Sequence, residues 1–495
     1  MTYVVCDARS GAVAAQGSFN FVEHLGSKYN LKDGGYLDQG EGVIRIPYGL
    51  LPDALDLTFA DVVKKLGNDR YQLARIVVSL QQHGMGAWLP HMGEGLYELG
   101  RNPKRPLSAG FQDLFATNEA TSWQDTASRQ DCEEFERAIP ADRWAELTGS
   151  SPMQSLRFMG AQIARLGRVH QEDFQRTNQF TVLASIVASI LVGKPVGIGL
   201  DEASCTLLMN LKRGVWSKTL LRSDCFPEGT SGRLPRILPP GARLGNLWRY
   251  HVVGHELPAA CQVSMGFGDN IAIMLTMANE PGQFGLSMGT SGTTYSEMDK
   301  ATYDPTHACH VLRSGTGKFM GMYCAANCGK FADAVRELAY LSWEQFDALV
   351  ANAQWDDPGA MILPTSDEAG LRLFNLKDGD RRSAYAVTRS IIADMWHHSR
   401  FMGDPDSIVV TGGFATEPVA QVVADMFQAK VFVSPKMNRV AMGSVVLGVS
   451  QVLGEPIPEV AARLCPKGKE IAPYPARAKF YEQFLANYAR NLRSI

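Results

Sequence analysis

Two stretches near the middle of the chain decide the fold and the chemistry that the sequence predicts: Met265-Gly266-Phe267-Gly268-Asp269-Asn270 and Leu286-Ser287-Met288-Gly289-Thr290-Ser291-Gly292-Thr293. The first places a carboxylate, Asp269, after an apolar segment at 261–265. The second is a turn of Gly, Thr and Ser whose backbone N–H groups can hold a phosphate. Each has a structural alternative, because Asp269 can also cap a helix and 289–292 can also be a plain hairpin turn. An acid that takes a proton, followed by a phosphate-holding turn, indicates phosphoryl transfer.

The overall composition is that of an ordinary soluble protein. At 495 residues the chain is too long for one core, so we expect two domains of roughly 200–250 residues each. A net charge of −3 and a charged fraction of 20% indicate neither a nucleic-acid partner nor an anionic membrane. Nine scattered cysteines and a start without a basic or long apolar run predict a cytoplasmic protein with reduced thiols. The longest apolar segment, 180–192, is too short to span a bilayer and predicts a buried helix.

Strand and helix patterns alternate along the chain. They predict strands at 3–6, 12–21, 76–80, 408–411 and 430–433, and helices at 57–66, from 128, at 183–192, 418–427 and 441–453. Residues 23–50 are Gly-rich and predict loop or short strands. The alternation predicts an α/β fold in each half. The Gly- and Pro-rich stretch at 226–245 is the best domain boundary, which gives domains 1–238 and 239–495.

Further candidates for a ligand site follow the predicted strands. Gln82 and His83 come where the strand at 76–80 ends, which is where ligands lie in open α/β sheets. Gly412 and Gly413 lie between a strand and a helix, where the missing Cβ lets a nucleotide approach the backbone. A structural histidine or a plain turn explains each of these alone. No P-loop and no Rossmann fingerprint is present, and Cys324 and Cys328 lack a second ligand pair, so no metal site is predicted.

The order of these segments, rather than any one of them, points to a family. The chain resembles the FGGY carbohydrate kinases and, within them, the xylulokinases. The matching segments are Gln82-His83-Gly84, Trp123-Gln124-Asp125, Leu147-Thr148-Gly149-Ser150, Asp201-Glu202-Ala203-Ser204, Gly268-Asp269-Asn270, Met288-Gly289-Thr290-Ser291-Gly292, Thr411-Gly412-Gly413, Ala424-Asp425 and Ala441-Met442-Gly443-Ser444. They follow the family order over nearly the whole chain.

The resemblance implies two actin-like (ribonuclease H-like) ATPase domains with a cleft between them. The sugar would lie mainly on domain 1–238, and ATP with Mg²⁺ mainly on domain 239–495. Asp269 matches the catalytic base. The implied sugar-binding residues are Gln82, His83, Asp125 and Asn270, and the implied ATP-binding residues are Gly289, Thr290, Ser291, Gly412 and Gly413.

These residue types suit the phosphorylation of a hydroxyl group. A sugar alcohol is a poor nucleophile, so a carboxylate must accept its proton as the O–P bond forms. Mg²⁺ and oriented N–H donors neutralise the charge on the γ-phosphoryl group. Closure of two domains would exclude water, which competes as the acceptor.

The chain departs from the family at its first residues. Family members open with a strand and an Asp-x-Gly-Thr-like loop that forms the first phosphate site, whereas residues 1–7 resemble the second strand. Three explanations stay open: a true start upstream, which we favour; a stable remnant with weak or no kinase activity; or another segment in the place of the missing strand. The loss would leave buried backbone groups unpaired, at about 1–3 kcal/mol each.

The predicted function is that of an ATP-dependent sugar kinase for a ketopentose, most of all D-xylulose, which becomes D-xylulose 5-phosphate. A kinase for another ketose or polyol such as ribulose is one alternative. A catalytically impaired binding or regulatory protein with the same fold is another. The sequence leaves open the exact sugar, the regulation and the oligomeric state, for which a homodimer is the alternative to a monomer.

Overall fold

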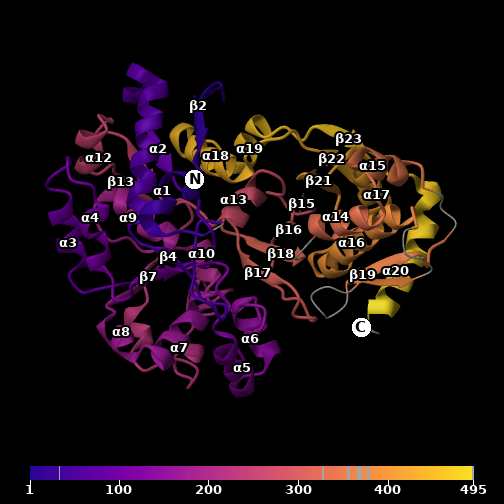
Figure 1. Ribbon diagram of the computed structural model, residues 1–495, viewed down its shortest axis with the longest axis horizontal. Coiled ribbons are helices and arrows are strands. Elements are labelled where there is room, and N and C mark those ends of the chain that lie inside the picture. Colours follow the sequence, from indigo (N-terminus) through magenta and orange to yellow (C-terminus); the bar gives the residue numbers. More distant parts are fainter. Residues whose placement is uncertain are drawn as a thin grey trace.

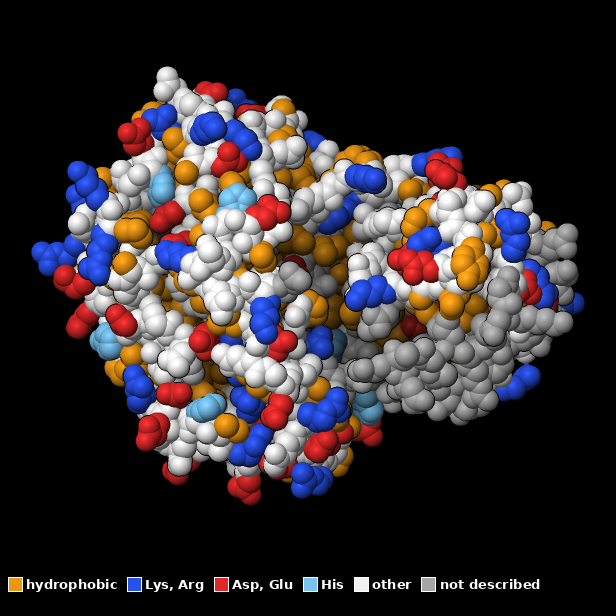
Figure 2. Space-filling view, viewed as in Figure 1, with side chains coloured by type: hydrophobic (Ala, Val, Ile, Leu, Met, Phe, Trp, Pro, Cys, Tyr) orange, Lys and Arg blue, Asp and Glu red, His pale blue; other side chains and the backbone are white. Residues whose placement is uncertain are grey.

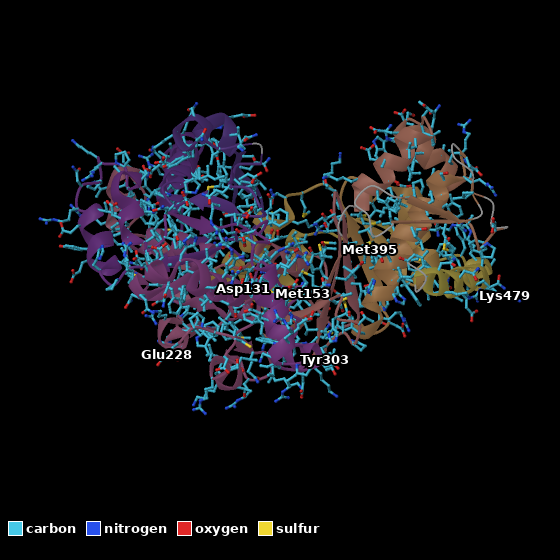
Figure 3. All side chains as sticks on the ribbon, turned by 60° about the horizontal axis from the view of Figure 1, so that its bottom comes forward. Asp131, Met153, Glu228, Tyr303, Met395 and Lys479 are labelled. Atoms are coloured by element: carbon cyan, nitrogen blue, oxygen red, sulfur yellow. The ribbon has the colours of Figure 1, made fainter. Side chains whose placement is uncertain are left out.

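The computed structural model describes residues 1–32, 34–325, 328–353, 357–364, 371–374, 376 and 380–492. Its chain forms two lobes, with the N-terminal half on the left of Figure 1 and most of the C-terminal half on the right. The turned view in Figure 3 shows the same division, with Asp131 and Glu228 in the first lobe and Met395 and Lys479 in the second. Helices and strands alternate in both lobes, which confirms the predicted α/β class. No helix in the described part of the chain is long and apolar enough to cross a membrane.

The second lobe is built on one seven-stranded sheet of order β17-β18-β16-β15-β21-β22-β23. β15, β21 and β22 are parallel, with Ser287 paired to Thr411 near the carboxyl end of β15 and β21. The strands are β15 (Gln283–Met288), β16 (Gly292–Met298), β17 (His310–Arg313), β18 (Phe319–Ala325), β19 (Met361–Pro364), β20 (Leu371–Phe374), β21 (Ser407–Thr411), β22 (Lys430–Val433) and β23 (Lys469–Ile471). The helices after residue 268 are α13 (Asp269–Leu275), α14 (Cys328–Leu338), α15 (Trp343–Ala351), α16 (Ser383–Ser399), α17 (Glu417–Phe427), α18 (Arg439–Leu453), α19 (Ile457–Leu464) and α20 (Ala478–Leu492).

The first lobe divides its strands among several small sheets. They are β1 (Thr2–Cys6), β2 (Val13–Ser18), β3 (Leu37–Asp38), β4 (Ile44–Pro47), β5 (Arg75–Val77), β6 (Met85–Trp88), β7 (Glu119–Thr121), β8 (Gln179–Val182), β9 (Ile198–Gly199), β10 (Met209–Asn210), β11 (Val215–Trp216), β12 (Ile237–Leu238), β13 (Arg243–Asn246) and β14 (Gln262–Ser264). The helices are α1 (Phe21–Tyr29), α2 (Leu50–Leu66), α3 (Met92–Leu99), α4 (Ser108–Phe111), α5 (Arg129–Ala138), α6 (Ala141–Thr148), α7 (Met159–Val169), α8 (Gln171–Arg176), α9 (Leu183–Val192), α10 (Leu200–Ser204), α11 (Lys218–Leu221) and α12 (Arg249–Gly254).

One sheet of the first lobe joins segments far apart in the sequence. β5 pairs in parallel with β14, and β14 pairs with β13. Val263 is buried in the same apolar cluster as Leu55 of α2 and Ile190 of α9. The residues of β13 and β14, which follow the sequence boundary at 238, therefore pack with the first lobe.

β1 and β2 form a separate hairpin. β5 lies at the edge of its own sheet, and within the described residues no strand pairs with the outer edge of β1 or of β5. Helix α18 packs against both β1 and β5 and also against α13. Ser79 and Ser444 place their hydroxyl oxygens 2.6 Å apart across this contact. One helix from the C-terminal half thus touches two sheets of the first lobe, those that contain β1 and β5, and the helix that begins at Asp269.

Candidate active site

Asp269 lies where two chain segments run side by side in very close contact. Beyond β5 and β14 the segments continue side by side, with the Leu80 N–H donating to the Phe267 carbonyl and the Asp269 N–H donating to the Leu80 carbonyl. A Cβ on Gly266 would lie 1.4 Å from the carbonyl oxygen of Val78. A Cβ on Gly268 would lie 2.2 Å from Cγ of Gln82. The Gly-x-Gly sequence therefore exists to bring residues 78–82 against the start of α13.

Asp269 is not the helix cap that its position also allowed. The N-cap of α13 is Gly268, and Asp269 is the first helical residue. Its Oδ1 accepts the Asn270 N–H at 2.9 Å and the Asn270 side-chain amide at 3.2 Å. The side chain is partly accessible. Burial raises the pKa of Asp269 from 3.8 to about 6, against the lowering effect of the backbone N–H groups of Asn270 and Gln82. A carboxylate with such a pKa is ionised at neutral pH and is a better base than a free aspartate.

The amides predicted to bind sugar form one network with the base. Asn270 Nδ2 donates to Gln82 Oε1 at 2.7 Å, and Asn270 Oδ1 accepts the Tyr295 hydroxyl at 2.8 Å. Gln82 Nε2 contacts Sγ of Cys205 at 3.2 Å. Tyr295 comes from β16, so this network ties the first lobe to the sheet of the second.

Two further carboxyl groups are buried behind the base. Asp201 and Glu202 lie in α10, and the Gly268 N–H donates to Asp201 Oδ2 at 3.3 Å. Burial raises the pKa of both groups, and the charges of Asp201 and Asp269 add to the rise at Glu202. Asp201 Oδ1 and Glu202 Oε1 are buried and have no hydrogen-bond partner among the described residues.

His83 belongs to a cluster of rings and one guanidinium group. Its ring stacks on Phe158 with centroids 4.4 Å apart, and the backbone has φ +72°. Burial lowers the pKa of His83 well below 6.5, and the charges of Arg157 and His310 lower it further. His83 is therefore neutral, and its Nδ1 has no hydrogen-bond partner among the described residues. A neutral imidazole with a free nitrogen is suited to a sugar hydroxyl.

Arg157 is a site residue that the sequence analysis missed. Its guanidinium lies 5.9 Å from the ring centroid of Trp123, and its buried Nε has no hydrogen-bond partner in the described chain. Trp123 is 40% exposed, and its Nε1 donates to the Tyr36 hydroxyl at 3.0 Å. The Tyr36 hydroxyl donates to Gln81, the neighbour of Gln82, at 3.0 Å. The motif Trp123-Gln124-Asp125 pointed to this region, whereas no sequence pattern marked Tyr36 or Arg157.

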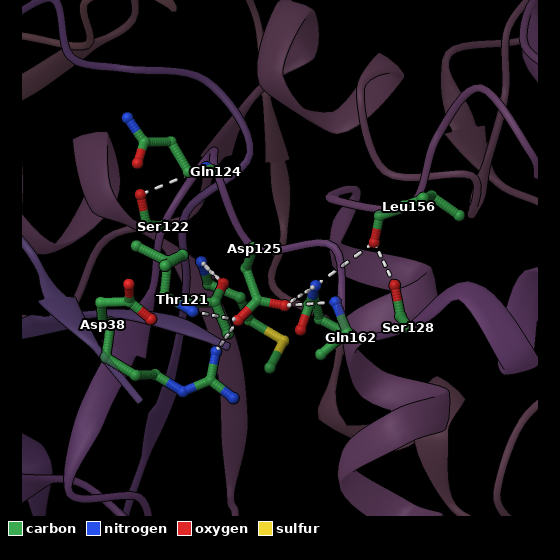
Figure 4. A network of polar contacts seen from close by, with 12 residues as sticks. Asp38, Thr121, Ser122, Gln124, Asp125, Ser128, Leu156 and Gln162 are labelled. Atoms are coloured by element: carbon green, nitrogen blue, oxygen red, sulfur yellow. Dashed lines mark hydrogen bonds and ion pairs between the residues drawn. The ribbon is translucent and has the colours of Figure 1, made fainter. Parts of the chain in front are cut away.

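Asp125 is fully buried within a closed polar network (Figure 4). Its carboxylate accepts the Ile44 N–H at 3.0 Å, the Ala127 N–H at 3.2 Å and the Gln162 side-chain amide at 3.0 Å, and it forms an ion pair with Arg45. These four donors occupy both oxygens. Asp125 therefore fixes the loop that carries Trp123. Its carboxylate can influence sugar binding only indirectly, through the position of that loop.

The two predicted ATP-binding turns lie against each other in the second lobe. Residues 289–291 form the hairpin turn between β15 and β16, with Thr290 and Ser291 exposed. A Cβ on Gly412, whose φ is +110°, would lie 2.3 Å from the Met288 carbonyl oxygen. Gly413 has open space around its Cα, with nothing within 4 Å of an added Cβ. Both turns follow the carboxyl ends of neighbouring parallel strands, where α/β sheets bind ligands.

Strand β16 connects Asn270, the neighbour of Asp269, to the predicted phosphate turn. Tyr295 contacts Asn270, and the turn at 289–291 lies at the start of the same strand. Tyr295 follows Ser291 by four positions, which is roughly 13 Å at about 3.3 Å per residue. Figure 2 shows the face of the molecule hollowed between the two lobes.

An exposed aromatic side chain lies beside the turn at Gly412 and Gly413, and the sequence analysis did not identify it. Trp343, at the start of α15, is 44% exposed, and its ring lies 6.4 Å from that of Phe414, next to Gly413. An exposed indole beside a glycine turn can pack on a nucleotide base.

Comparisons with known proteins agree with this geometry. No protein-family model matches the chain. A probable D-xylulose kinase A of Aspergillus clavatus is 28% identical over 382 residues, which cover 72% of this chain and 64% of the relative. A xylulose kinase of Mus musculus is 24% identical over 486 residues, which cover 93% of this chain and 87% of the relative. The chain thus spans less than two thirds of the first of these curated relatives.

Solved structures show the fold. A xylulose kinase from Brucella ovis has a TM-score of 0.82 at 15% identity, with 100% of this chain and 96% of that chain covered. A ligand-bound xylulose kinase from Lactobacillus acidophilus has a TM-score of 0.79 at 17% identity, with 100% and 95% covered. A Plasmodium falciparum glycerol kinase with ADP has a TM-score of 0.77 at 13% identity, with 98% and 94% covered. The predicted two-domain fold of carbohydrate kinases is therefore confirmed.

Proposed function

We propose that the protein is an ATP-dependent sugar kinase of the FGGY type that converts D-xylulose to D-xylulose 5-phosphate. The observation that carries this proposal is Asp269, partly accessible and with a pKa raised to about 6, linked through Asn270 to Tyr295 in the middle of β16, the strand that begins after the Gly289–Ser291 turn. The names of the relatives in Aspergillus clavatus and Mus musculus support D-xylulose as the substrate.

In this proposal Asp269 accepts the proton of the reacting hydroxyl while the O–P bond forms. Asn270 and Gln82 hold the carboxylate in place and offer amide groups to the neighbouring hydroxyls. His83 and Arg157 each provide a buried nitrogen without a partner among the described residues, Nδ1 of His83 and the donor Nε of Arg157. Trp123 provides an exposed apolar surface. A neutral polyol is recognised by such a mixture of amide, imidazole and guanidinium groups.

ATP is proposed to bind to the second lobe. The exposed backbone of Thr290 and Ser291 offers N–H groups to a phosphate. The open space at Gly413 admits the adenosine moiety, and Trp343 lies at the edge of that space. Closure of the lobes over both substrates would exclude water from the reaction.

The residues present also fit Mg²⁺, which binds oxygen ligands and keeps water and substrate phosphates in its shell. Asp201 and Glu202 present buried carboxylate oxygens without hydrogen-bond partners among the described residues. These two carboxylates would hold the ion, and Asp269 would keep its proposed role as the base. The ion, when bound, neutralises charge on the transferred phosphoryl group.

We also propose a division of the chain into a sugar-binding and an ATP-binding domain. Because β13 and β14 pair with β5, we place residues 243–264 with the sugar-binding lobe and the seven-stranded sheet with ATP. All nine cysteines are free, which supports the proposed cytoplasmic location. A homodimer stays the alternative to a monomer.

The test measures ADP release by the purified chain with Mg²⁺-ATP and a panel of D-xylulose, D-ribulose, xylitol and glycerol. We expect the highest kcat/KM with D-xylulose. A second measurement, calorimetry with D-xylulose alone, separates the two classes of function. Sugar binding without turnover would favour the catalytically impaired binding protein. Absence of both binding and turnover with every sugar would overturn the proposal.

A further inference from the structure

The segment Arg249-Tyr250-His251-Val252-Val253-Gly254-His255 places two imidazoles four residues apart, outside the site described above. Residues with this spacing lie on one face of a helix, and here they lie at α12 and its C-cap. That face meets Asp56 of α2, with His255 Nε2 2.9 Å from Asp56 Oδ1. In Figure 1 the two helices lie in the upper left of the first lobe.

We propose that Asp56, His251 and His255 bind one divalent transition-metal ion, with Zn²⁺ as the best match. One ligand atom from each of the three side chains lies within 4.8 Å of the other two. Ligands about 2.1 Å from a tetrahedral ion are roughly 3.4 Å apart, so small side-chain movements complete the site. Two imidazoles and one carboxylate match the borderline preference of Zn²⁺, whereas Mg²⁺ and Ca²⁺ prefer oxygen ligands alone.

His251 already has the surroundings of a metal ligand. Its side chain is 0% exposed, and its Nε2 lies 3.1 Å from the carbonyl oxygen of Ile190. Donation from Nε2 to that carbonyl leaves a lone pair on Nδ1, and Nδ1 is buried with no hydrogen-bond partner among the described residues. Metal-binding histidines commonly donate their second ring nitrogen to a backbone carbonyl in this way.

A cavity of about 500 Å³ gives access to the cluster. Asp56 and His255 line it, together with Tyr250, Lys28 and Lys104. Lys28 is paired with Asp53 at 2.5 Å, so part of the positive charge in the cavity is already neutralised. The cavity has room for the water that completes four-coordination.

A second group of similar composition, formed by Asp304, Cys309 and His398, serves as the control. The carboxylate of Asp304 accepts N–H groups from Thr306, Ala308 and Cys309. The thiol of Cys309 donates to the carbonyl oxygen of His398. The carboxylate and the thiol are thus engaged within the protein, and only Nδ1 of His398 has no hydrogen-bond partner among the described residues, so we expect no ion there.

The experiment uses the full chain, stripped with a chelator and titrated with Zn²⁺ by calorimetry and with Co²⁺ by visible absorption. We expect one equivalent of each ion, a Co²⁺ spectrum without a thiolate charge-transfer band, and a higher melting temperature with Zn²⁺. His255→Gln and Asp56→Asn, both at partly exposed positions, should each weaken binding about 10- to 100-fold. His398→Gln should leave affinity unchanged.

No saturable binding up to millimolar Zn²⁺, or equal affinity in wild type and His255→Gln, would overturn the site. A thiolate band in the Co²⁺ spectrum would also overturn it, because it would assign the ion to cysteine. None of these measurements depends on kinase activity, so the result is independent of the proposed function.

Discussion

Asp269, the proposed base, shows how burial of a carboxyl group raises its pKa at the expense of the stability of the folded chain. Because burial raises the pKa of Asp269 to about 6, the folded protein holds a proton on this group between about pH 4 and pH 6 more tightly than the unfolded chain does. The free energy of unfolding therefore falls as the pH rises through that range. A rise from 3.8 to about 6 corresponds to at most about 3 kcal/mol.

Asp269→Asn should accordingly stabilise the protein and inactivate it. We expect the variant to unfold at higher temperature than wild type at pH 7.5, with a difference that shrinks as the pH falls from about 6 and is smallest below 3.8, where the wild-type carboxyl is mostly protonated in both states. Turnover should fall by roughly a hundredfold or more. Calorimetric melting at several pH values and an ADP-release assay check this, and a variant with near-normal turnover would remove Asp269 from the role of base.

For wild type, the same pKa predicts the pH profile of catalysis. Activity needs the ionised carboxylate, so log kcat/KM should rise with slope near one below about pH 6 and level off above it. The measurement is an initial-rate profile at subsaturating D-xylulose. A profile that stays flat down to pH 4.5 would contradict a base with this pKa.

Arg157→Leu tests the residue that only the structure revealed. The buried guanidinium lacks a partner at Nε, and a hydrogen bond to a charged donor is worth about 1.5–3 kcal/mol. KM for the sugar should rise at least tenfold while KM for ATP stays unchanged. Arg168→Leu is the matched control, because Arg168 pairs with Asp131 at 2.8 Å and its loss should affect only stability. A normal sugar KM in Arg157→Leu would exclude Arg157 from the sugar site.

At this scale the sequence predicted the residues that belong to a recognisable motif better than those that belong to none. Asp269, Asn270 and Gln82 come together as expected, since close packing of two Gly-flanked segments brings them into contact. Arg157 and Tyr36 meet the site only through tertiary packing, which leaves no local pattern. The buried network around Asp125 was invisible for the same reason.

At the scale of elements, the two glycines after β21, Gly412 and Gly413, have different structural roles. A Cβ on Gly412 would collide with Met288, whereas a Cβ on Gly413 would meet no protein atom within 4 Å. Gly412→Ala should destabilise the protein by about 1–3 kcal/mol, because the added methyl group and φ of +110° are both unfavourable. Gly413→Ala should leave the melting temperature unchanged and raise KM for ATP. An unchanged KM for ATP in Gly413→Ala would show that the open space does not admit the nucleotide.

Gly443 and Gly448 on α18 form a similar pair. A Cβ on Gly443 would lie 2.2 Å from the Ala272 carbonyl oxygen in α13, whereas one on Gly448 would meet Val77 at an ordinary 3.5 Å. Gly448→Ala should stabilise the protein by about 0.5–1 kcal/mol through its higher helix propensity. Gly443→Ala should destabilise it by about 1–3 kcal/mol and lower kcat, since α13 carries Asp269. Denaturant unfolding and steady-state kinetics measure both, and equal stabilisation by the two would refute the close contact.

Elements with strong periodicity were predicted well, and short ones were not. The apolar run that predicted a helix at 183–192 is α9, and the helix at 57–66 is the C-terminal part of α2, which ends at Gly67 with φ +54°. Residues 23–50 were expected to be loop or short strands, which missed α1. That helix is nine residues long and depends on the cap at Asn20, a signal too short for periodicity to detect.

At the scale of the whole molecule, length and alternation predicted two α/β domains, and composition alone placed the predicted boundary at 238. The Gly- and Pro-rich stretch at 226–245 had the composition of a linker, yet β13 and β14 follow it and return to pair with β5. Such pairing joins segments nearly two hundred residues apart, and composition does not report it.

Closure of the lobes is the expected motion during catalysis. Adding D-xylulose together with a non-hydrolysable ATP analogue should reduce the radius of gyration in solution scattering, whereas either ligand alone should give a smaller change. Asp269→Asn should close to the same extent, because closure depends on binding rather than on proton transfer. An unchanged radius of gyration with both ligands would contradict a mobile cleft.

The single strand that runs from Tyr295 to the Gly289–Ser291 turn has a consequence for regioselectivity. In the proposed kinase, β16 is hydrogen-bonded on both sides, by β15 and β18, and therefore holds Tyr295 and the Gly289–Ser291 turn at a fixed distance from each other. A fixed distance between the two ends of the site selects the reacting hydroxyl by its position along the carbon chain of the sugar. It does not discriminate between configurations at carbons that lie outside that distance. Sugars of equal chain length should therefore compete for the site more successfully than shorter or longer ones with the same configuration at the reacting carbon.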